Sequence, residues 1–118
     1  MSPETEELLQ DILDRAKEVQ GFVKEMKFQK YRSDSRTRLA VERSFEIIGE
    51  ALNRVKKVEP EILENIREHR SIISFRNILA HAYDSVEDKI VWGIVEGDLP
   101  DLIEDIERIK EDTTRRWI

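Results

Sequence analysis

The sequence contains no cysteine, no long apolar run and only two histidines. The absence of cysteine excludes disulfide bonds and thiolate metal sites within this chain. Its longest apolar stretch, residues 90–95, is interrupted by Gly93 and is far shorter than the roughly 20 residues that a membrane-spanning helix needs. The opening residues MSPETEELLQ have neither a basic nor an apolar segment, so no signal peptide is indicated and a cytosolic location is expected.

The sequence is rich in charged side chains. They make up 39% of its 118 residues, against about 25% in an average globular protein. The net charge of -6 argues against a protein that coats nucleic acid non-specifically, because such proteins are usually basic. The apolar share of 39% is sufficient for amphipathic helices, and the length predicts one domain that spans residues 1–118.

Apolar residues recur at helical spacing along most of the chain, and no segment alternates as a strand would. Ser2 followed by Pro3 is typical of a helix start. The predicted helices are 3–30, 37–57, a short one at 60–67, 71–83, 86–96, and a last one that follows a break at 97–100 and ends near 115. The short connections indicate an all-α, up-and-down bundle of four to five helices.

The predicted helix 71–83 separates an apolar face from a polar one. On a helical wheel with Arg76 at zero, its apolar residues fall in one arc from about 200° to about 320°. These residues, predicted to face the core, are Ile72, Phe75, Ile78, Leu79 and Ala82. The remaining polar face carries Arg76, Asn77, His81 and Tyr83. Gly49, inside the predicted helix 37–57, indicates a close helix crossing, with a chance surface glycine as the alternative.

The polar face combines groups that suit the cleavage of a phosphodiester. A guanidinium binds phosphate in a bidentate manner, and an imidazole titrates near neutral pH. His81 is therefore a candidate general acid or base, Arg76 a candidate phosphate clamp, and Asn77 a residue that orients either of them. One helix supplies only one copy of each group. A second chain across a twofold axis would complete a cleft, so a homodimer is expected.

The residues Arg76-Asn77-Ile78-Leu79-Ala80-His81-Ala82-Tyr83 resemble the R-x4-H-x-Y signature of HepT-type HEPN proteins, in which a polar residue usually follows the arginine. The match is complete at those positions. The segment 42–51 looks like the second helix of that family, and Val91-Trp92 with Asp98-Leu99-Pro100 is similar to its closing helices. The resemblance covers essentially the whole chain.

The resemblance implies a homodimeric HEPN-like bundle that acts as a metal-independent endoribonuclease toxin on RNA. It also implies a nucleotidyltransferase antitoxin of the MntA type, as in a type VII-like toxin-antitoxin pair. In the family the antitoxin can transfer AMP to the motif tyrosine, which here is Tyr83. A nucleotide two residues from His81 would obstruct the cleft and oppose phosphate binding by its charge.

Family membership does not establish turnover, and two other interpretations remain open. The polar face could form a hydrogen-bonded dimer interface. The chain could also be a non-catalytic helical subunit that binds and regulates a nucleotidyltransferase. Loss of His81 would not affect such a subunit.

Three further side chains have competing interpretations. Glu46 and Glu50 lie on adjacent turns and are candidates to orient Arg76 by an ion pair, with a solvated surface as the alternative. His69, between two predicted helices, is interpreted as a solvated or capping histidine without a functional role. No cofactor is indicated, because the sequence has no metal-ligand pair of histidines and no glycine-rich phosphate loop.

Overall fold

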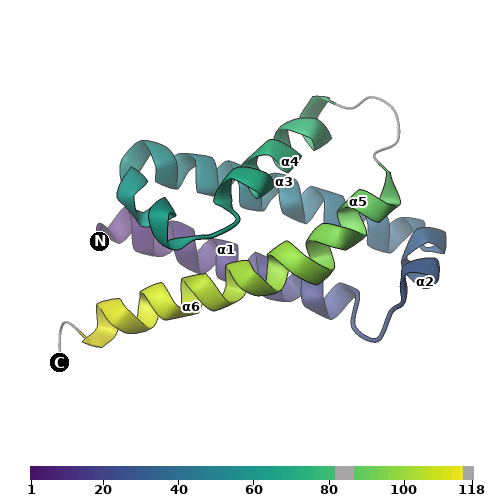
Figure 1. The fold of residues 1–118 in the computed structure, drawn as a ribbon, viewed down its shortest axis with the longest axis horizontal. Helices are drawn as coiled ribbons and strands as arrows, with labels where there is room; N and C mark the ends of the chain where they lie inside the picture. The colour runs from purple at the N-terminus through teal and green to yellow at the C-terminus, as the bar shows by residue number, and fades with distance from the viewer. Residues whose placement is uncertain (82–86, 116–118) are drawn as a thin grey trace.

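In the computed structural model, which describes residues 1–81 and 87–115, the chain forms an all-α bundle (Figure 1). The predicted fold class is confirmed, and no strand occurs in those two ranges. The α-helices are α1 (Pro3–Phe22), α2 (Phe28–Ser33), α3 (Ser35–Val58), α4 (His69–His81), α5 (Asp88–Gly93) and α6 (Leu99–Arg115). A 3-10 helix, Pro60–Asn65, precedes α4, and a π-helical segment, Ile94–Asp98, joins α5 to α6.

The long helices α1 and α3 run antiparallel to each other, and α6 crosses the bundle beside α1 (Figure 1). Helix α4 packs chiefly against α3. The elements enclose one hydrophobic core, whose fully buried members include Leu9, Ile12, Phe45, Ile48, Leu52 and Ile106. None of the helices in the described ranges is both long and apolar enough to cross a membrane.

Helix α1 begins as the sequence predicts. Ser2 is the N-cap residue, and its hydroxyl oxygen accepts a hydrogen bond from the backbone N–H of Thr5 at 3.1 Å. Glu59, directly after α3, accepts hydrogen bonds from the Ser2 backbone N–H at 2.9 Å and the Thr5 hydroxyl at 3.0 Å. These bonds lower the pKa of the Glu59 carboxyl and tie the start of α1 to the end of α3.

The predicted first helix, 3–30, is wrong at its end. Helix α1 stops at Phe22, and the chain turns through Glu25, which has a left-handed φ of 63°. The separate helix α2 then places Tyr31 and Phe28 against Trp92 of α5, with ring centroids 5.1 and 6.5 Å apart. The turn is therefore explained by aromatic contacts between segments that are distant in the sequence.

The predicted break at 97–100 is also wrong, because α5 and α6 form one continuous rod (Figure 1). The N–H of Leu99 donates to the carbonyl of Ile94, which is the i to i+5 pattern of a π-helical turn. Pro100 then occupies the first turn of α6. A proline is tolerated there because the π-helical turn directly before it already interrupts the regular i to i+4 hydrogen bonds.

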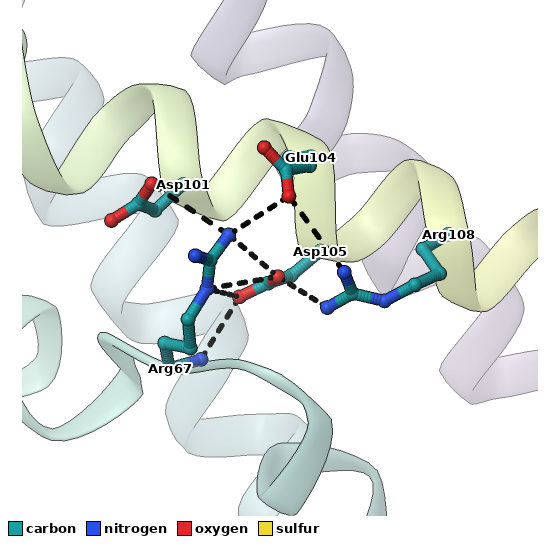
Figure 2. A network of polar contacts seen from close by, with 5 residues as sticks. All are labelled: Arg67, Asp101, Glu104, Asp105 and Arg108. Atoms are coloured by element: carbon teal, nitrogen blue, oxygen red, sulfur yellow. Dashed lines mark hydrogen bonds and ion pairs between the residues drawn. The ribbon is translucent and has the colours of Figure 1, made fainter.

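A buried carboxylate fixes the segment before α4 onto α6 (Figure 2). Asp105 has no solvent exposure and accepts hydrogen bonds from the backbone N–H of Arg67 at 3.0 Å and from its Nε at 3.2 Å. Arg108 donates to the same carboxylate at 2.5 Å. Burial alone raises the pKa of Asp105, but these bonds outweigh it and hold that pKa below the usual value.

Candidate active site

Helix α4 buries a narrower stripe than its pattern predicts. Ile72, Phe75 and Leu79 are buried, as expected. Ile78 was predicted to face the core and is 54% exposed, so that prediction is wrong. Ile78 lies at the edge of the apolar arc, and a helix that packs on one main neighbour covers only the centre of such an arc. Ala82, also predicted to be buried, lies outside the described residues.

Helices α3 and α4 pass close to each other at Gly49, so the predicted close crossing is confirmed. A Cβ atom at Gly49 would lie 2.3 Å from Cβ and 2.7 Å from Cγ of Arg76, and 3.4 Å from the carbonyl oxygen of Ile72. Real Cβ atoms essentially never come within 3.0 Å of such a neighbour, so a side chain here would force Arg76 or the backbone to shift. The glycine therefore allows the first atoms of Arg76 to rest against the backbone of α3.

We expect Gly49→Ala to lower the free energy of unfolding by about 1 to 3 kcal/mol, because the added methyl group forces the two helices apart. This loss exceeds the gain of up to about 1 kcal/mol that alanine provides in a helix. Urea unfolding followed by circular dichroism measures the change. Gly93→Ala is the matched control: Gly93 is helical with open space around it, so that variant should be equally or more stable than the wild type. Equal stability of the Gly49 variant and the wild type would contradict the steric argument.

Arg76 is held by two polar partners. Its Nη2 lies 2.5 Å from Oε2 of Glu50, and its Nη1 donates to Oδ1 of Asn77 at 3.0 Å. The arginine side chain keeps 29% of its surface exposed. Glu46 instead pairs with Arg43 at 2.9 Å. Of the two acids considered from the sequence, only Glu50 contacts Arg76.

The other motif residues lie toward the C-terminal end of α4. His81 is the last residue of the helix and is exposed, as is Asn77 one turn before it. Within the described ranges His81 makes no hydrogen bond or ion pair. Tyr83 lies outside the described residues. The structure thus brings Arg76, Asn77 and Glu50 into contact and leaves the imidazole of His81 facing solvent.

A groove of about 380 Å³ runs beside Arg76, between α1, α3 and α4. Its lining includes Leu8 and Asp11 of α1, Glu50 of α3 and Ala80 of α4. Two further arginines, Arg43 and Arg54, also line it. Arg54 was not singled out from the sequence, although it follows Glu46 and Glu50 at intervals of four residues, which places all three on one face of α3.

Comparison with known proteins identifies the family of the chain. Residues 12–109, which contain Arg76 and His81, match the family described as "Ribonuclease HepT-like". The chain belongs to the HepT-like family. It is 32% identical over 107 residues to "Probable ribonuclease HepT" of Thermococcus cleftensis, which covers 87% of this chain and 93% of that protein.

Two proteins of Methanocaldococcus jannaschii are similar to the same extent. The chain is 33% identical over 106 residues to "Putative RNase MJ0127", covering 88% of this chain and 85% of that protein. It is 32% identical over 99 residues to "Putative RNase MJ1380", covering 84% and 90% respectively. No solved structure matches the chain. The HepT-like assignment thus extends over most of the bundle, from α1 to α6.

Proposed function

We propose that this HepT-like chain is a metal-independent endoribonuclease in which Arg76 and His81 carry out the chemistry. The observation that carries the proposal is the placement of Arg76. Its guanidinium is oriented by Glu50 and Asn77, lies at a groove, and belongs to the same short helix as the exposed His81. A fixed, partly exposed guanidinium is suited to binding a phosphate group.

The reaction follows from the groups present. One imidazole takes the proton of a ribose 2′-hydroxyl, and the resulting oxygen attacks the neighbouring phosphorus. The bond from phosphorus to the 5′-oxygen breaks, and an imidazolium returns a proton to that leaving oxygen. The products are a 2′,3′-cyclic phosphate and a 5′-hydroxyl. Arg76 stabilises the negative charge that develops on the phosphate oxygens during the attack.

Two imidazoles are needed at one cleft, and each chain has one in the motif, so the active form is proposed to be a homodimer. Sedimentation at micromolar concentration should give a mass twice that of the 14.0 kDa chain.

The direct test is incubation of the purified dimer with single-stranded RNA in EDTA. Cleavage that yields cyclic phosphate ends supports the proposal. Intact mass should first confirm that the chain carries no covalent nucleotide. An unmodified dimer that leaves RNA intact would instead favour a non-catalytic subunit that binds and regulates a nucleotidyltransferase.

Glu50 is proposed to orient Arg76 during catalysis. Glu50→Gln should slow RNA cleavage by up to about 5-fold, since an exposed ion pair contributes at most about 1 kcal/mol. Glu46→Gln is the matched control, because Glu46 lies one turn away on α3 and pairs with Arg43. Initial rates of both variants measure the difference. Equal rates for the wild type and both variants would assign Glu50 to the solvated surface.

We propose further that the ribonuclease is a toxin, neutralised by a nucleotidyltransferase antitoxin that transfers AMP to Tyr83. A nucleotide attached there would carry negative charge close to His81 and oppose the approach of RNA. Co-expression with a nucleotidyltransferase encoded beside this chain should add the mass of one AMP group. Tyr83→Phe should prevent that addition and abolish protection of the cell by the antitoxin. Unchanged protection would show that neutralisation does not depend on modification of Tyr83.

A further inference from the structure

A second cavity lies at the opposite end of α4 from His81. Its volume is about 490 Å³, and it is formed by the end of α3, the 3-10 helix and the first turns of α4. Its lining contains three basic side chains, those of Lys56, His69 and Arg70, and the hydroxyl group of Ser74. Pro60, Leu63 and Ile73 supply an apolar wall. The cavity is within the size range of small-ligand sites and combines apolar and polar walls, as such sites do.

The basic groups of this cavity are not neutralised by ion pairs. Neither Lys56 nor Arg70 has an ion-pair partner in the part of the chain that the structure describes. Glu64 is the one carboxylate in the lining, so the two cations leave a single net positive charge. Negative charge is also favoured there by the N-terminus of α4, a helix of 13 residues that starts at His69.

His69 differs from the solvated or capping residue expected from the sequence. Its Nδ1 atom is buried and has no hydrogen-bond partner, which is costly for a polar atom. Burial is the main cause that lowers the pKa of His69, and the charges of Arg70 and Lys56 lower it further. A bound anion would oppose the effect of the two cations on His69, because it would supply the opposite charge.

We propose that this cavity binds the phosphate monoester of a nucleotide, with Lys56, His69 and Arg70 around the phosphate. The sugar and base then lie along the apolar wall that includes Leu63 and Ile73. The apolar wall favours a nucleotide over an inorganic anion, since it would remain uncovered by phosphate alone. The site is independent of the proposed cleavage reaction. Its phosphate-binding residues on α4, His69 and Arg70, lie about three helical turns from His81 and about two turns from Arg76.

The chain itself provides a simple probe, because it has only two histidines. Their imidazole Hε1 signals can be followed by proton NMR and assigned with His69→Gln. Titration with adenosine 5′-monophosphate should shift the His69 signal to saturation and raise the pKa of His69. Adenosine without phosphate, and inorganic phosphate without the nucleoside, should each bind at least 10-fold more weakly. Lys56→Ala and Arg70→Ala should each weaken nucleotide binding at least 10-fold.

Lys57→Ala is the matched control, since Lys57 is the next residue on α3 and does not line the cavity. This variant should bind the nucleotide as the wild type does. Thermal unfolding of all variants checks that they remain folded. No shift of His69 at millimolar nucleotide would overturn the proposal, as would a shift confined to His81. Equal affinity for inorganic phosphate and the nucleotide would also overturn it, because the cavity would then be a non-specific anion site.

The phosphate monoester could belong to a free nucleotide or to the 5′ end of an RNA chain. A trinucleotide with 2′-O-methyl groups, which resists cleavage, separates these sources when prepared with a 5′-phosphate and with a 5′-hydroxyl. Tighter binding of the phosphorylated trinucleotide than of the mononucleotide identifies an RNA end as the ligand. Tighter binding of the mononucleotide identifies the free nucleotide. Cleavage of RNA that carries a 5′-hydroxyl should be the same in the Lys56 and Arg70 variants as in the wild type, because such RNA offers this cavity no phosphate monoester. The cavity and the proposed ribonuclease site can therefore fail separately.

Discussion

His81→Ala is expected to slow RNA cleavage about 10²- to 10⁴-fold, because the variant loses the group that moves protons at the reacting oxygens. The substitution should leave the fold intact, since His81 is exposed at the end of α4. Initial rates on single-stranded RNA in EDTA measure the effect, and thermal unfolding checks the fold. Cleavage that persists unchanged in His81→Ala would identify a contaminating nuclease.

Arg76→Ala should reduce cleavage by a similar factor, about 10²- to 10³-fold, since the charge that develops on phosphate loses its stabilising donor. Arg76→Lys should recover only part of the rate, because an ammonium group cannot bind phosphate in a bidentate manner. Arg43→Ala is the control: Arg43 lines the same groove and pairs with a glutamate, but its side chain is 70% exposed. An equal loss in this control would mean that the groove attracts RNA only through its general charge.

Asp105→Asn is expected to lower the free energy of unfolding by about 3 kcal/mol at neutral pH. This is the low end of the effect of removing one member of a buried ion pair. The low end applies because Arg67 and Arg108 are each about half exposed and can be rehydrated. The backbone N–H of Arg67 loses its charged acceptor at the same time. Urea unfolding at pH 7 measures the loss.

The effect of Asp105 should also depend on pH. Because the pKa of Asp105 is lowered by folding, its stabilisation is complete above the unfolded value of about 3.9 and disappears as the pH falls through the folded value. The gap between the wild type and Asp105→Asn should therefore close in acid. Glu104→Gln is the control, since Glu104 contacts the same two arginines and is 64% exposed. The Glu104→Gln variant should lose less than about 1 kcal/mol of its free energy of unfolding. Equal losses in the two variants would show that burial does not matter here.

Local patterns predicted the helical fold because nearly every long helix has a clear apolar stripe and α1 has a clear start. They failed where contacts between distant segments determine the backbone. Gly21 lies one residue before the end of α1, but Glu25, which has the left-handed φ, is not a residue that usually adopts it. The aromatic contacts with Trp92 involve a segment more than 60 residues away. The π-helical turn before Leu99 lets the helix continue through a Gly-Asp-Leu-Pro segment that is otherwise typical of a helix break.

Prediction of the site also succeeded where a pattern within one helix was sufficient and failed where separate segments meet. A close helix crossing at Gly49 and an ion pair of Arg76 with Glu46 or Glu50 were both predicted, the latter because the two acids lie on adjacent turns of α3. Nothing in the sequence indicated that Arg76 itself packs against Gly49. The pairing of Glu46 with Arg43 was not foreseen, because both acids occupy similar positions on α3. The cavity around His69 was also missed. Its members come from three separate elements, and no single segment displays them together.

The tight crossing at Gly49 has a consequence for the entropy of binding. Free arginine side chains lose up to about 2 kcal/mol of rotational freedom when a ligand orders them. In this bundle Cβ and Cγ of Arg76 already rest against the backbone of α3, so part of that freedom is lost during folding. An incoming phosphate then meets a preorganised guanidinium and orders only its outer bonds. If Arg76 binds phosphate as proposed, Gly49 favours that binding although it has no side chain with which to touch an anion.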